Sequence, residues 1–346
     1  MGFNIDKDFW DRVRDTDKPI VLYGTGNGAD MIVDEFERRE LKLSAIFASD
    51  GFVRDRTFRG FKVISYQEAK EKHGDMLVIL GFGTHDKAVI ENIKRIASEN
   101  ELYMPDMLKA EDGHLFDREY FETHIKDIEY TYDILADERS RQNFEQIIKF
   151  KLSGDIKYLL EDQEAEVESW RLLNFGKDEI FVDCGAYNGD TISRFISLSG
   201  SYKHIYAFEP DKKTFKKLEK NTSSLKNIEL YNVAVSDKVE TLYFDIGKGR
   251  GSKLGGKVEI PTLTLDSVVR DATVLKFDTE GFEEKALKGG EGLIKRCKPK
   301  MIISAYHKID DLWCLPCTVQ EIDPSYKFYL RKAIAIPAWD SNLYLV

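Results

Sequence analysis

An apolar, strand-like segment that runs directly into a glycine turn and then into a helix-like segment occurs twice in this chain of 346 residues. The first copy is VLYGTGNGAD at residues 21–30, and the second is FVDCGAYNGD at residues 181–190. Glycine allows the backbone to turn sharply between strand and helix, and this unit is the starting element of doubly wound α/β folds. The repetition therefore predicts two α/β domains, each with its own glycine turn.

The first block alternates strands with helices. The apolar runs PIVLYG, LSAIFASD and DMLVILGFG read as strands, the second of them ending at Asp50, and residues 28–39 and 85–100 carry apolar side chains at helical spacing. Strands that alternate with helices favour a parallel sheet covered on both faces. We therefore predict a Rossmann-like domain over residues 1–110.

The middle block, residues 111–175, lacks a strand pattern and is rich in charged and aromatic residues. In ADERSRQNFEQIIKFKLSG, Asp137 is a plausible helix N-cap and Gly154 a plausible helix stop. This block is predicted to be a helical linker of two or three helices. Such helices could cover an active site or form a homodimer contact, and the sequence leaves both open.

The third block, residues 176–346, returns to the alternating pattern. EIFVDCG, HIYAFEP, IELYNVAVS, VLKFDTEG, PKMIISAYH, YKFYLRKA and SNLYLV read as strands, and ETLYFDIG with KVEIPTLTLDSV as an antiparallel excursion. A helical segment between them is broken at Gly289 and Gly290. The predicted fold class is α/β, with two doubly wound Rossmann-like domains joined by a helical segment.

Charge and hydropathy limit the partners of the chain. The formal net charge is −10 at pH 7, whereas duplex binding needs clustered Lys and Arg, so we expect no nucleic-acid partner. No apolar run approaches the roughly 18 residues of a membrane span. The first ten residues lack a signal-peptide pattern, and Asp6 stands where a myristoylation signal has Ser or Thr. The prediction is a cytoplasmic enzyme that acts on a small molecule or a glycan.

The four cysteines give no clear metal site. Cys314 and Cys317 form a CxxC motif, which can be redox-active or half of a zinc site. Zinc sites usually take four ligands, and the sequence offers neither a second cysteine pair nor a His-x-x-x-His motif. We therefore interpret them as reduced structural thiols and predict no bound metal.

The second glycine turn contains an acid. Asp183 ends the strand, and Gly185 and Gly189 follow in the turn. A carboxylate repels a pyrophosphate and attracts a cationic ligand. S-adenosylmethionine carries an ammonium and a sulfonium and no phosphate. The next strand ends at Glu209, about 20 residues later, where nucleotide folds place the acid that holds the ribose. Alternatively, Asp183 is a helix cap and Glu209 a surface acid.

Six stretches of residues 180–346 resemble, in order, the FkbM family of S-adenosylmethionine-dependent methyltransferases. They are VDCGAYNGDT, AFEPD, LYNVAVSD, PTLTLDS, KFDTEGFEEKALKGG and ISAYHKIDDLW. The resemblance implies a class I methyltransferase fold and O-methylation of a hydroxyl, often on a sugar or polyketide. It also implies these cofactor-binding residues: Asp183, Gly185, Ala186, Gly189, Glu209, Asn232, Ala234 and Ser252.

Three side chains are candidates for a catalytic base. Asp278 and Glu280 end the fourth strand of the third block, and the resemblance places Asp278 near the transferred methyl group. His307 ends the fifth strand, and an ordinary imidazole pKa suits a base. Each has a plainer alternative: a loop-ordering contact, a first-turn helix acid or a backbone-bonded histidine. A metal on Asp278 and Glu280 is a further alternative, for which the sequence offers no clear third ligand.

The first glycine turn fits another ligand. GTGNGA matches G-x-G-x-x-G/A with Ala29 in the third slot. Taken alone, this suggests NAD. The N-terminal block also resembles the small domain of bacterial sugar-amine acetyltransferases, which implies nucleotide-sugar binding. The alternative is an empty pocket that serves packing or dimerisation. The substrate-binding candidates here are Gly24, Gly26, Gly28 and Asp50.

Taken together, the sequence predicts an S-adenosylmethionine-dependent O-methyltransferase that acts on a hydroxyl of a sugar, a glycan or a related metabolite. Two alternatives stay open. One is an NAD- or nucleotide-sugar-dependent enzyme run by the N-terminal domain, and the other is a non-catalytic binding protein on the same fold.

Overall fold

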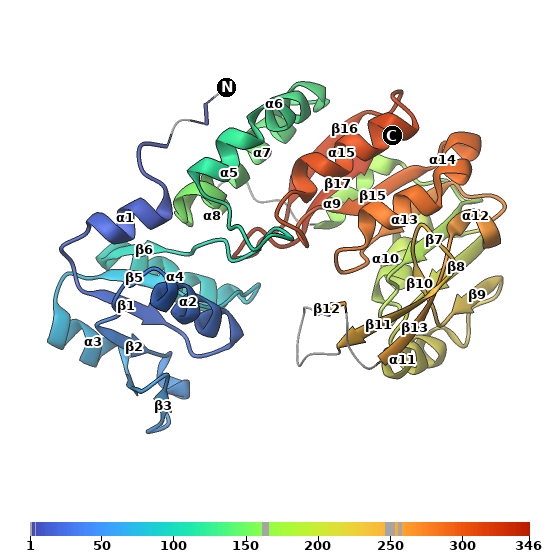
Figure 1. Cartoon of the computed structure of the whole chain (residues 1–346). Helices are drawn as coiled ribbons and strands as arrows, with labels where there is room; N and C mark the ends of the chain where they lie inside the picture. The colour runs from blue at the N-terminus through green and yellow to red at the C-terminus, as the bar shows by residue number, and fades with distance from the viewer. Residues whose placement is uncertain (1, 4, 161–165, 246–252, 255–257) are drawn as a thin grey trace. The chain divides into compact units, whose positions relative to one another are not determined.

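The computed structural model of the chain describes residues 2, 3, 5–160, 166–245, 253–254 and 258–346 (Figure 1). The chain forms two compact units. Unit 1 comprises residues 1–126, 141–164 and 332–340, and unit 2 comprises residues 127–140, 165–331 and 341–346. The segment predicted as a linker, 111–175, contributes to both units.

Unit 1 is built on a six-stranded sheet in the order β3-β4-β2-β1-β5-β6. All neighbours from β4 to β6 pair in parallel, and β3 pairs antiparallel with β4 at the edge. The parallel strands follow the 3-2-1-4-5 order of a Rossmann fold. The strands are β1 (Ile20–Tyr23), β2 (Ala45–Phe47), β3 (Thr57–Phe58), β4 (Phe61–Ile64), β5 (Leu77–Leu80) and β6 (Glu101–Tyr103).

Alternate residues of the unit 1 strands face opposite layers of helices, because successive strand side chains point to opposite faces. Ile20 and Leu22 pack in one core cluster with α1 and α2, whereas Val21 and Tyr23 pack in another with α3 and α4. The helices of this unit are α1 (Phe9–Asp15), α2 (Asn27–Arg38), η1 (Asp50–Phe52), α3 (Tyr66–His73), α4 (Lys87–Glu99), α5 (Arg118–Thr123), most of α7 (Glu138–Ser153) and α8 (Lys157–Leu160).

Unit 2 is built on a seven-stranded sheet in the order β16-β17-β15-β14-β7-β8-β9. The neighbours from β15 to β9 pair in parallel, and β17 runs antiparallel to β15. The chain reverses its direction of strand addition between β7 and β14, which is the position where such sheets bind ligands. The strands are β7 (Ile180–Cys184), β8 (His204–Phe208), β9 (Ile228–Tyr231), β14 (Val274–Phe277), β15 (Lys300–Ser304), β16 (Phe328–Lys332) and β17 (Ser341–Leu345).

A smaller sheet and several helices complete unit 2. The small sheet has the order β10-β13-β11-β12, and β11 pairs antiparallel with β13 as predicted. Its strands are β10 (Ala234–Val235), β11 (Thr241–Asp245), β12 (Lys253–Leu254) and β13 (Val258–Leu263). The helices are most of α6 (Ile125–Ile134), α9 (Glu166–Trp170), η2 (Arg171–Leu173), α10 (Asp190–Ser199), α11 (Lys212–Thr222), α12 (Leu265–Val268), α13 (Glu283–Gly289), α14 (Glu291–Cys297) and α15 (Asp311–Ile322).

The described part of the middle segment forms the 16-residue helix α7 and four shorter helices, α5, α6, α8 and α9, where two or three helices were expected. Both predicted boundary signals of α7 are confirmed. Asp137 Oδ1 accepts a hydrogen bond from the Ser140 amide at 2.8 Å, and the helix ends before Gly154, whose φ is +67°. Aperiodic charged and aromatic residues separate the shorter helices, so sequence periodicity did not resolve them. Of the described helices, none combines the length and apolarity of a membrane span.

Candidate active site

The end of β7 buries a carboxylate. Asp183 is fully buried, and its Oδ1 lies 3.4 Å from Lys276 Nζ on the neighbouring strand β14. Its Oδ2 is buried and has no hydrogen-bond partner. Burial raises the pKa of Asp183 to about 6, against the opposing charge of Lys276. A buried carboxylate oxygen without a partner is costly, so this position is prepared for a further donor or cation.

The glycines of the second turn bring two strand ends together. Gly185 has φ +87°, and a Cβ there would lie 1.8 Å from the Asp278 carbonyl oxygen. The Gly185 and Ala186 amides donate to the Phe208 carbonyl at 3.0 and 2.9 Å. Gly189, at φ +88°, caps the start of α10. The turn therefore holds the ends of β14, β7 and β8 at close range.

Glu209 directly follows β8 and organises the loops beside it. It is 7% exposed, and its two carboxylate oxygens accept the amides of Tyr187 and Asp211 at 3.0 and 2.8 Å. Burial raises the pKa of Glu209 to about 7, although these amides lower it. Each oxygen keeps a second lone pair. Glu209 thus joins the glycine turn to the β8 loop and can still accept ribose hydroxyls.

The remaining predicted cofactor residues follow β9. Asn232 donates from Nδ2 to the carbonyls of Glu209 and Pro210, at 2.8 and 3.1 Å, so it closes the loop that carries the acid. Ala234 lies in β10 and is partly exposed. Ser252 lies outside the described residues.

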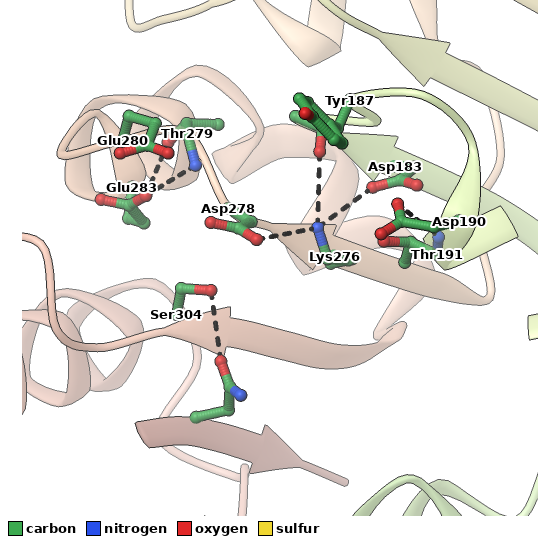
Figure 2. A network of polar contacts seen from close by, with 12 residues as sticks. Asp183, Tyr187, Asp190, Thr191, Lys276, Asp278, Thr279, Glu280, Glu283 and Ser304 are labelled. Atoms are coloured by element: carbon green, nitrogen blue, oxygen red, sulfur yellow. Dashed lines mark hydrogen bonds and ion pairs between the residues drawn. The ribbon is translucent and has the colours of Figure 1, made fainter. Parts of the chain in front are cut away.

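Lys276 is a site residue that sequence reasoning missed. Figure 2 shows its ammonium between Asp183 and Asp278, and Nζ lies 3.4 Å from Asp183 Oδ1 and 3.3 Å from Asp278 Oδ2. Burial works against the ammonium, but the charges of the two acids outweigh burial and raise the pKa of Lys276. The available signal was a lysine within the apolar strand VLKF, because buried lysines are nearly always paired.

The structure brings the three predicted catalytic candidates together, with Asp278 and Glu280 beside the imidazole of His307. His307 Nε2 lies 3.5 Å from Asp278 Oδ1 and 3.9 Å from Glu280 Oε2. Nδ1 lies 2.9 Å from Glu283 Oε1, which fixes the ring. Burial alone would lower the pKa of His307, but the bond to Glu283 and the neighbouring acids raise it to about 9. The imidazole is therefore protonated at neutral pH in this arrangement.

Glu283 is the second residue that sequence reasoning missed. It is 1% exposed at the start of α13, and its Oε1 accepts the Thr279 amide at 2.7 Å. Its Oε2 is buried without a hydrogen-bond partner. In GFEEKALKGG it reads as an ordinary acid in the first turn of a helix. Only the fold brings it to His307, 24 residues away.

Asp311 supports the same imidazole from its backbone side. This buried residue of α15 accepts the amides of His307 and Lys308 on Oδ2, at 2.8 and 2.6 Å. Burial and the charge of Glu283 raise the pKa of Asp311 to about 7. The loop after β15 is thereby held in one conformation.

Two surface cavities lie apart from these catalytic candidates. The cavity in unit 2 measures about 470 Å³ and opens at the start of α10, where it includes Gly189 but none of Asp278, Glu280 and His307. The cavity in unit 1 measures about 510 Å³ and is lined by residues such as Arg38 and Lys109. The acids at the strand ends are instead tied to Lys276 and His307.

The first glycine turn lies at the matching position of unit 1. A Cβ at Gly24 would lie 2.8 Å from Phe82 Cδ1, and one at Gly28 would lie 2.7 Å from the Gly81 oxygen. Gly26 has no atom within 4 Å of such a Cβ, and it caps α2 without a side-chain bond. Gly24 and Gly28 therefore serve packing, and Gly26 leaves space for a ligand.

The predicted position of Asp50 at the end of a strand is wrong. Strand β2 ends at Phe47, and residues Asp50–Phe52 form the short helix η1. The Phe52 amide donates to the Ser49 carbonyl at 2.7 Å, which turns the chain before Asp50 can extend the strand. The side chain of Asp50 lies outside what the structure describes.

The cysteines form no disulfide bond. Cys314 and Cys317 lie in α15, which also contains Pro316. Burial raises the pKa of the Cys314 thiol to about 12 and also raises that of Cys317. Neither thiol is therefore a reactive thiolate, which agrees with a structural role.

Comparison with known proteins identifies the C-terminal part. Residues 183–331 match the family model described as the methyltransferase FkbM domain, which confirms the resemblance there. The match covers less than half of the 346 residues and leaves the N-terminal block outside it. The resemblance of that block to sugar-amine acetyltransferases is not confirmed. No curated protein matches the chain.

One solved structure shares the fold over most of the chain. The methyltransferase FkbM from Methylobacillus flagellatus KT has 22% identity and a TM-score of 0.74, over 95% of this chain and 90% of that chain. This likeness confirms the α/β fold class. A Streptococcus mutans protein in complex with SAH has 15% identity and a TM-score of 0.38, over 53% and 97%. A precorrin-6y C5,15-methyltransferase from Geobacter metallireducens GS-15 has 12% identity and a TM-score of 0.34, over 54% and 89%.

Proposed function

We propose that unit 2 is an O-methyltransferase that uses S-adenosylmethionine and acts on a hydroxyl of a sugar, a glycan or a related metabolite. One observation carries the proposal. Two buried acids, Asp183 and Glu209, stand at the carboxyl ends of the adjacent parallel strands β7 and β8, and one oxygen of Asp183 has no partner. Strand β7 pairs with β14, which Asp278 and Glu280 follow, on a domain that matches the methyltransferase FkbM model.

The residues present fit a cationic cofactor. An unpartnered, buried carboxylate oxygen favours an ammonium or a sulfonium over a phosphate, because like charges repel strongly where water is excluded. Asp183 would hold the methionine end, and Glu209 would accept the ribose hydroxyls with its outer lone pairs. When bound, S-adenosylmethionine supplies the methyl group.

The side chains after β14 and β15 would handle the acceptor. Asp278 and Glu280 are 32% and 54% exposed, so an acceptor hydroxyl can reach either carboxylate. The pKa of His307, raised to about 9, leaves its imidazole protonated near neutral pH. In this arrangement a carboxylate therefore takes the acceptor proton, and His307 orients and balances the charge of that carboxylate. Positioning a base in this way contributes about 10²–10⁴-fold.

Calorimetry separates this proposal from the alternatives. The full chain is titrated with S-adenosylhomocysteine, NAD and a UDP-sugar. We expect binding of S-adenosylhomocysteine that Asp183→Ala weakens at least tenfold, since it loses the buried acid. Tight NAD binding without any S-adenosylhomocysteine binding would contradict the proposal and favour an enzyme whose active site lies in unit 1.

A methyl-transfer screen then addresses the acceptor. Radiolabelled S-adenosylmethionine is offered with free sugars, nucleotide-sugars and glycans. We expect label on a hydroxyl of at least one class, and strong loss of transfer in Asp278→Ala. Cofactor binding with no transfer to any of these acceptors would favour the non-catalytic alternative.

A further inference from the structure

We propose that His307, Asp278 and Glu280 bind one divalent transition-metal ion, and that Glu283 orients the histidine for it. The ion would contact His307 Nε2 and one oxygen from each of the two acids. These groups lie at the carboxyl ends of β14 and β15, on the acceptor side of the proposed cofactor site. The metal site itself does not depend on methyl transfer.

The distances suit a shared ion. Nε2 lies 3.5 Å from Asp278 Oδ1 and 3.9 Å from Glu280 Oε2. Two ligands that each lie roughly 2.1 Å from one ion are about 3.0–3.5 Å apart in octahedral or tetrahedral geometry. Small side-chain movements would therefore close the set. Donor atoms of Asp278, Glu283 and His307 also lie within 4.8 Å of one another.

The histidine is held as metal-binding histidines are. A ligating imidazole almost always donates its other ring N–H to a carboxylate, which fixes the ring and its tautomer. Here Nδ1 faces Glu283 Oε1 at 2.9 Å, so Nε2 is the nitrogen turned toward the acids. Nε2 would then contact the ion directly.

Glu283 gives a second, independent observation. Its side chain is 1% exposed, and Oε2 has no hydrogen-bond partner although the same carboxylate holds His307 through Oε1. A half-satisfied buried carboxylate is costly unless added positive charge lies close by. An ion on the opposite side of the imidazole would supply that charge.

The charge balance of the region points the same way. Lys276 brings one positive charge. Four carboxylates contact Lys276 or His307: Asp183, Asp278, Glu280 and Glu283. A divalent cation would offset most of this excess of negative charge.

One imidazole and two carboxylates suit a particular ion class. Imidazole favours transition metals such as Zn²⁺, while carboxylates also accept Mn²⁺ and Mg²⁺. The mixed set therefore favours Mn²⁺ or Zn²⁺ over Mg²⁺, which prefers oxygen ligands and keeps most of its waters. An ion here would face an acceptor oxygen. This role of the ion rests on the proposed function, whereas the metal site itself does not.

Metal titration of the full chain tests the site. Protein stripped with EDTA is titrated with Mn²⁺, Zn²⁺ and Mg²⁺ by calorimetry, and Mn²⁺ is followed by electron paramagnetic resonance. We expect about one ion per chain and nitrogen coupling from an imidazole in the Mn²⁺ spectrum. His307→Gln should remove the nitrogen coupling and weaken binding at least tenfold. Glu283→Gln, which loosens the ring, should weaken binding about 10–100-fold.

The matched control is Glu284→Gln. Glu284 neighbours Glu283 on α13 but pairs with Lys288 at the surface, so its loss should leave metal affinity unchanged. If His307→Gln does not fold, Glu280→Gln replaces it, because Glu280 is 54% exposed and we expect the variant to fold and to bind the ion more weakly. Wild-type protein that binds neither Mn²⁺ nor Zn²⁺, or variants that bind as wild type, would overturn the site.

Binding of S-adenosylhomocysteine is measured in the same samples, which separates the two proposals. If the wild-type protein binds S-adenosylhomocysteine but no metal ion, only the metal site is overturned. Metal binding without S-adenosylhomocysteine binding leaves the metal site standing and overturns the proposed cofactor.

Discussion

The two glycine turns occupy the same position in two similar sheets, yet their surroundings differ in charge. In unit 1 the turn hydroxyl of Thr25 accepts a hydrogen bond from the guanidinium of Arg56. In unit 2 the corresponding strand end buries Asp183. A cation at the first turn suits an anionic ligand, and an acid at the second suits a cationic one. We therefore expect the side chains beside each turn, rather than the glycines, to decide the ligand class.

The glycines themselves mostly serve packing. Gly28 lets α2 approach the Gly81 carbonyl, and Gly185 lets the turn approach the Asp278 carbonyl. Gly26 differs, because a Cβ there would meet no atom within 4 Å. A glycine-rich turn is therefore evidence for the fold before it is evidence for a ligand.

The largest contrast is expected from alanine at these glycines. Gly185→Ala places a Cβ against the Asp278 oxygen at positive φ, and we expect a loss of about 3–5 kcal/mol in the free energy of unfolding. Gly26→Ala meets open space at φ −99°, and we expect a change within about 1 kcal/mol. Urea denaturation measures both changes. Equal losses would contradict the different packing of Gly185 and Gly26.

Next in size is the loss of the buried cation. Lys276→Met leaves Asp183 and Asp278 without their shared partner, and we expect destabilisation by about 2–4 kcal/mol. Lys288→Met, which removes an exposed helix pair with Glu284, should cost under about 0.5 kcal/mol. Thermal unfolding of both variants tests this difference. A Lys276→Met protein as stable as wild type would mean that the ammonium contributes no net stability.

Two buried acids, one from each unit, should contribute to the pH dependence of stability with opposite signs. Glu35 in unit 1 is buried and paired with Arg38 and Arg39, which lower its pKa to about 2 against the effect of burial. Its contribution to stability is present above its unfolded pKa, near 4.5, and is lost as the pH falls toward 2. Burial raises the pKa of Glu209 in unit 2 to about 7. Its contribution is present below pH 4.5 and is lost as the pH rises through 7.

Urea unfolding of wild type and Glu209→Gln between pH 4.5 and 8 measures the second effect. The wild type should lose about 1–3 kcal/mol more than the variant over this range. Glu35→Gln serves as the control from unit 1, and it should follow the wild-type curve there. Parallel curves for all three proteins would contradict the raised pKa of Glu209.

The smallest effect concerns the cofactor. Asp183→Asn keeps the shape of the side chain and removes its charge, so we expect about tenfold weaker binding of S-adenosylhomocysteine, roughly 1.4 kcal/mol. Ser49→Ala, beside the first turn, should leave that binding unchanged. Calorimetry measures the affinity of both variants for S-adenosylhomocysteine. Weaker binding by Ser49→Ala would indicate that the first turn contacts the same ligand.

Much of this architecture could be predicted from local patterns. Apolar runs indicated the strands. Two acids could be placed from their position in these runs, because Asp183 is the next-to-last residue of β7 and Glu209 directly follows β8. Lys276 could not be placed, because its partner depends on sheet register. Lys276 pairs directly across from Asp183, so their side chains share one face, and 93 residues separate them in sequence.

Glu283 and the helix boundaries of the middle segment escaped prediction for similar reasons. Glu283 contacts His307, which follows a different strand of the sheet. The two residues therefore meet only after the sheet has formed. Apart from α7, the helices of the middle segment have ten residues or fewer, so each offers little helical periodicity to recognise. Long-range contacts, rather than local propensity, determine these parts.

The interleaving of the two units has a consequence for how this chain can be divided. Ile336, ten residues from the end, is buried in the core of unit 1, whereas the next strand, β17, completes the sheet of unit 2. A fragment cut at residue 175 would remove Ile336 from its core and leave an apolar tail on the other piece. During synthesis on the ribosome, we therefore expect the core of unit 1 to stay incomplete until Ile336 has emerged, and the sheet of unit 2 until β17 has emerged.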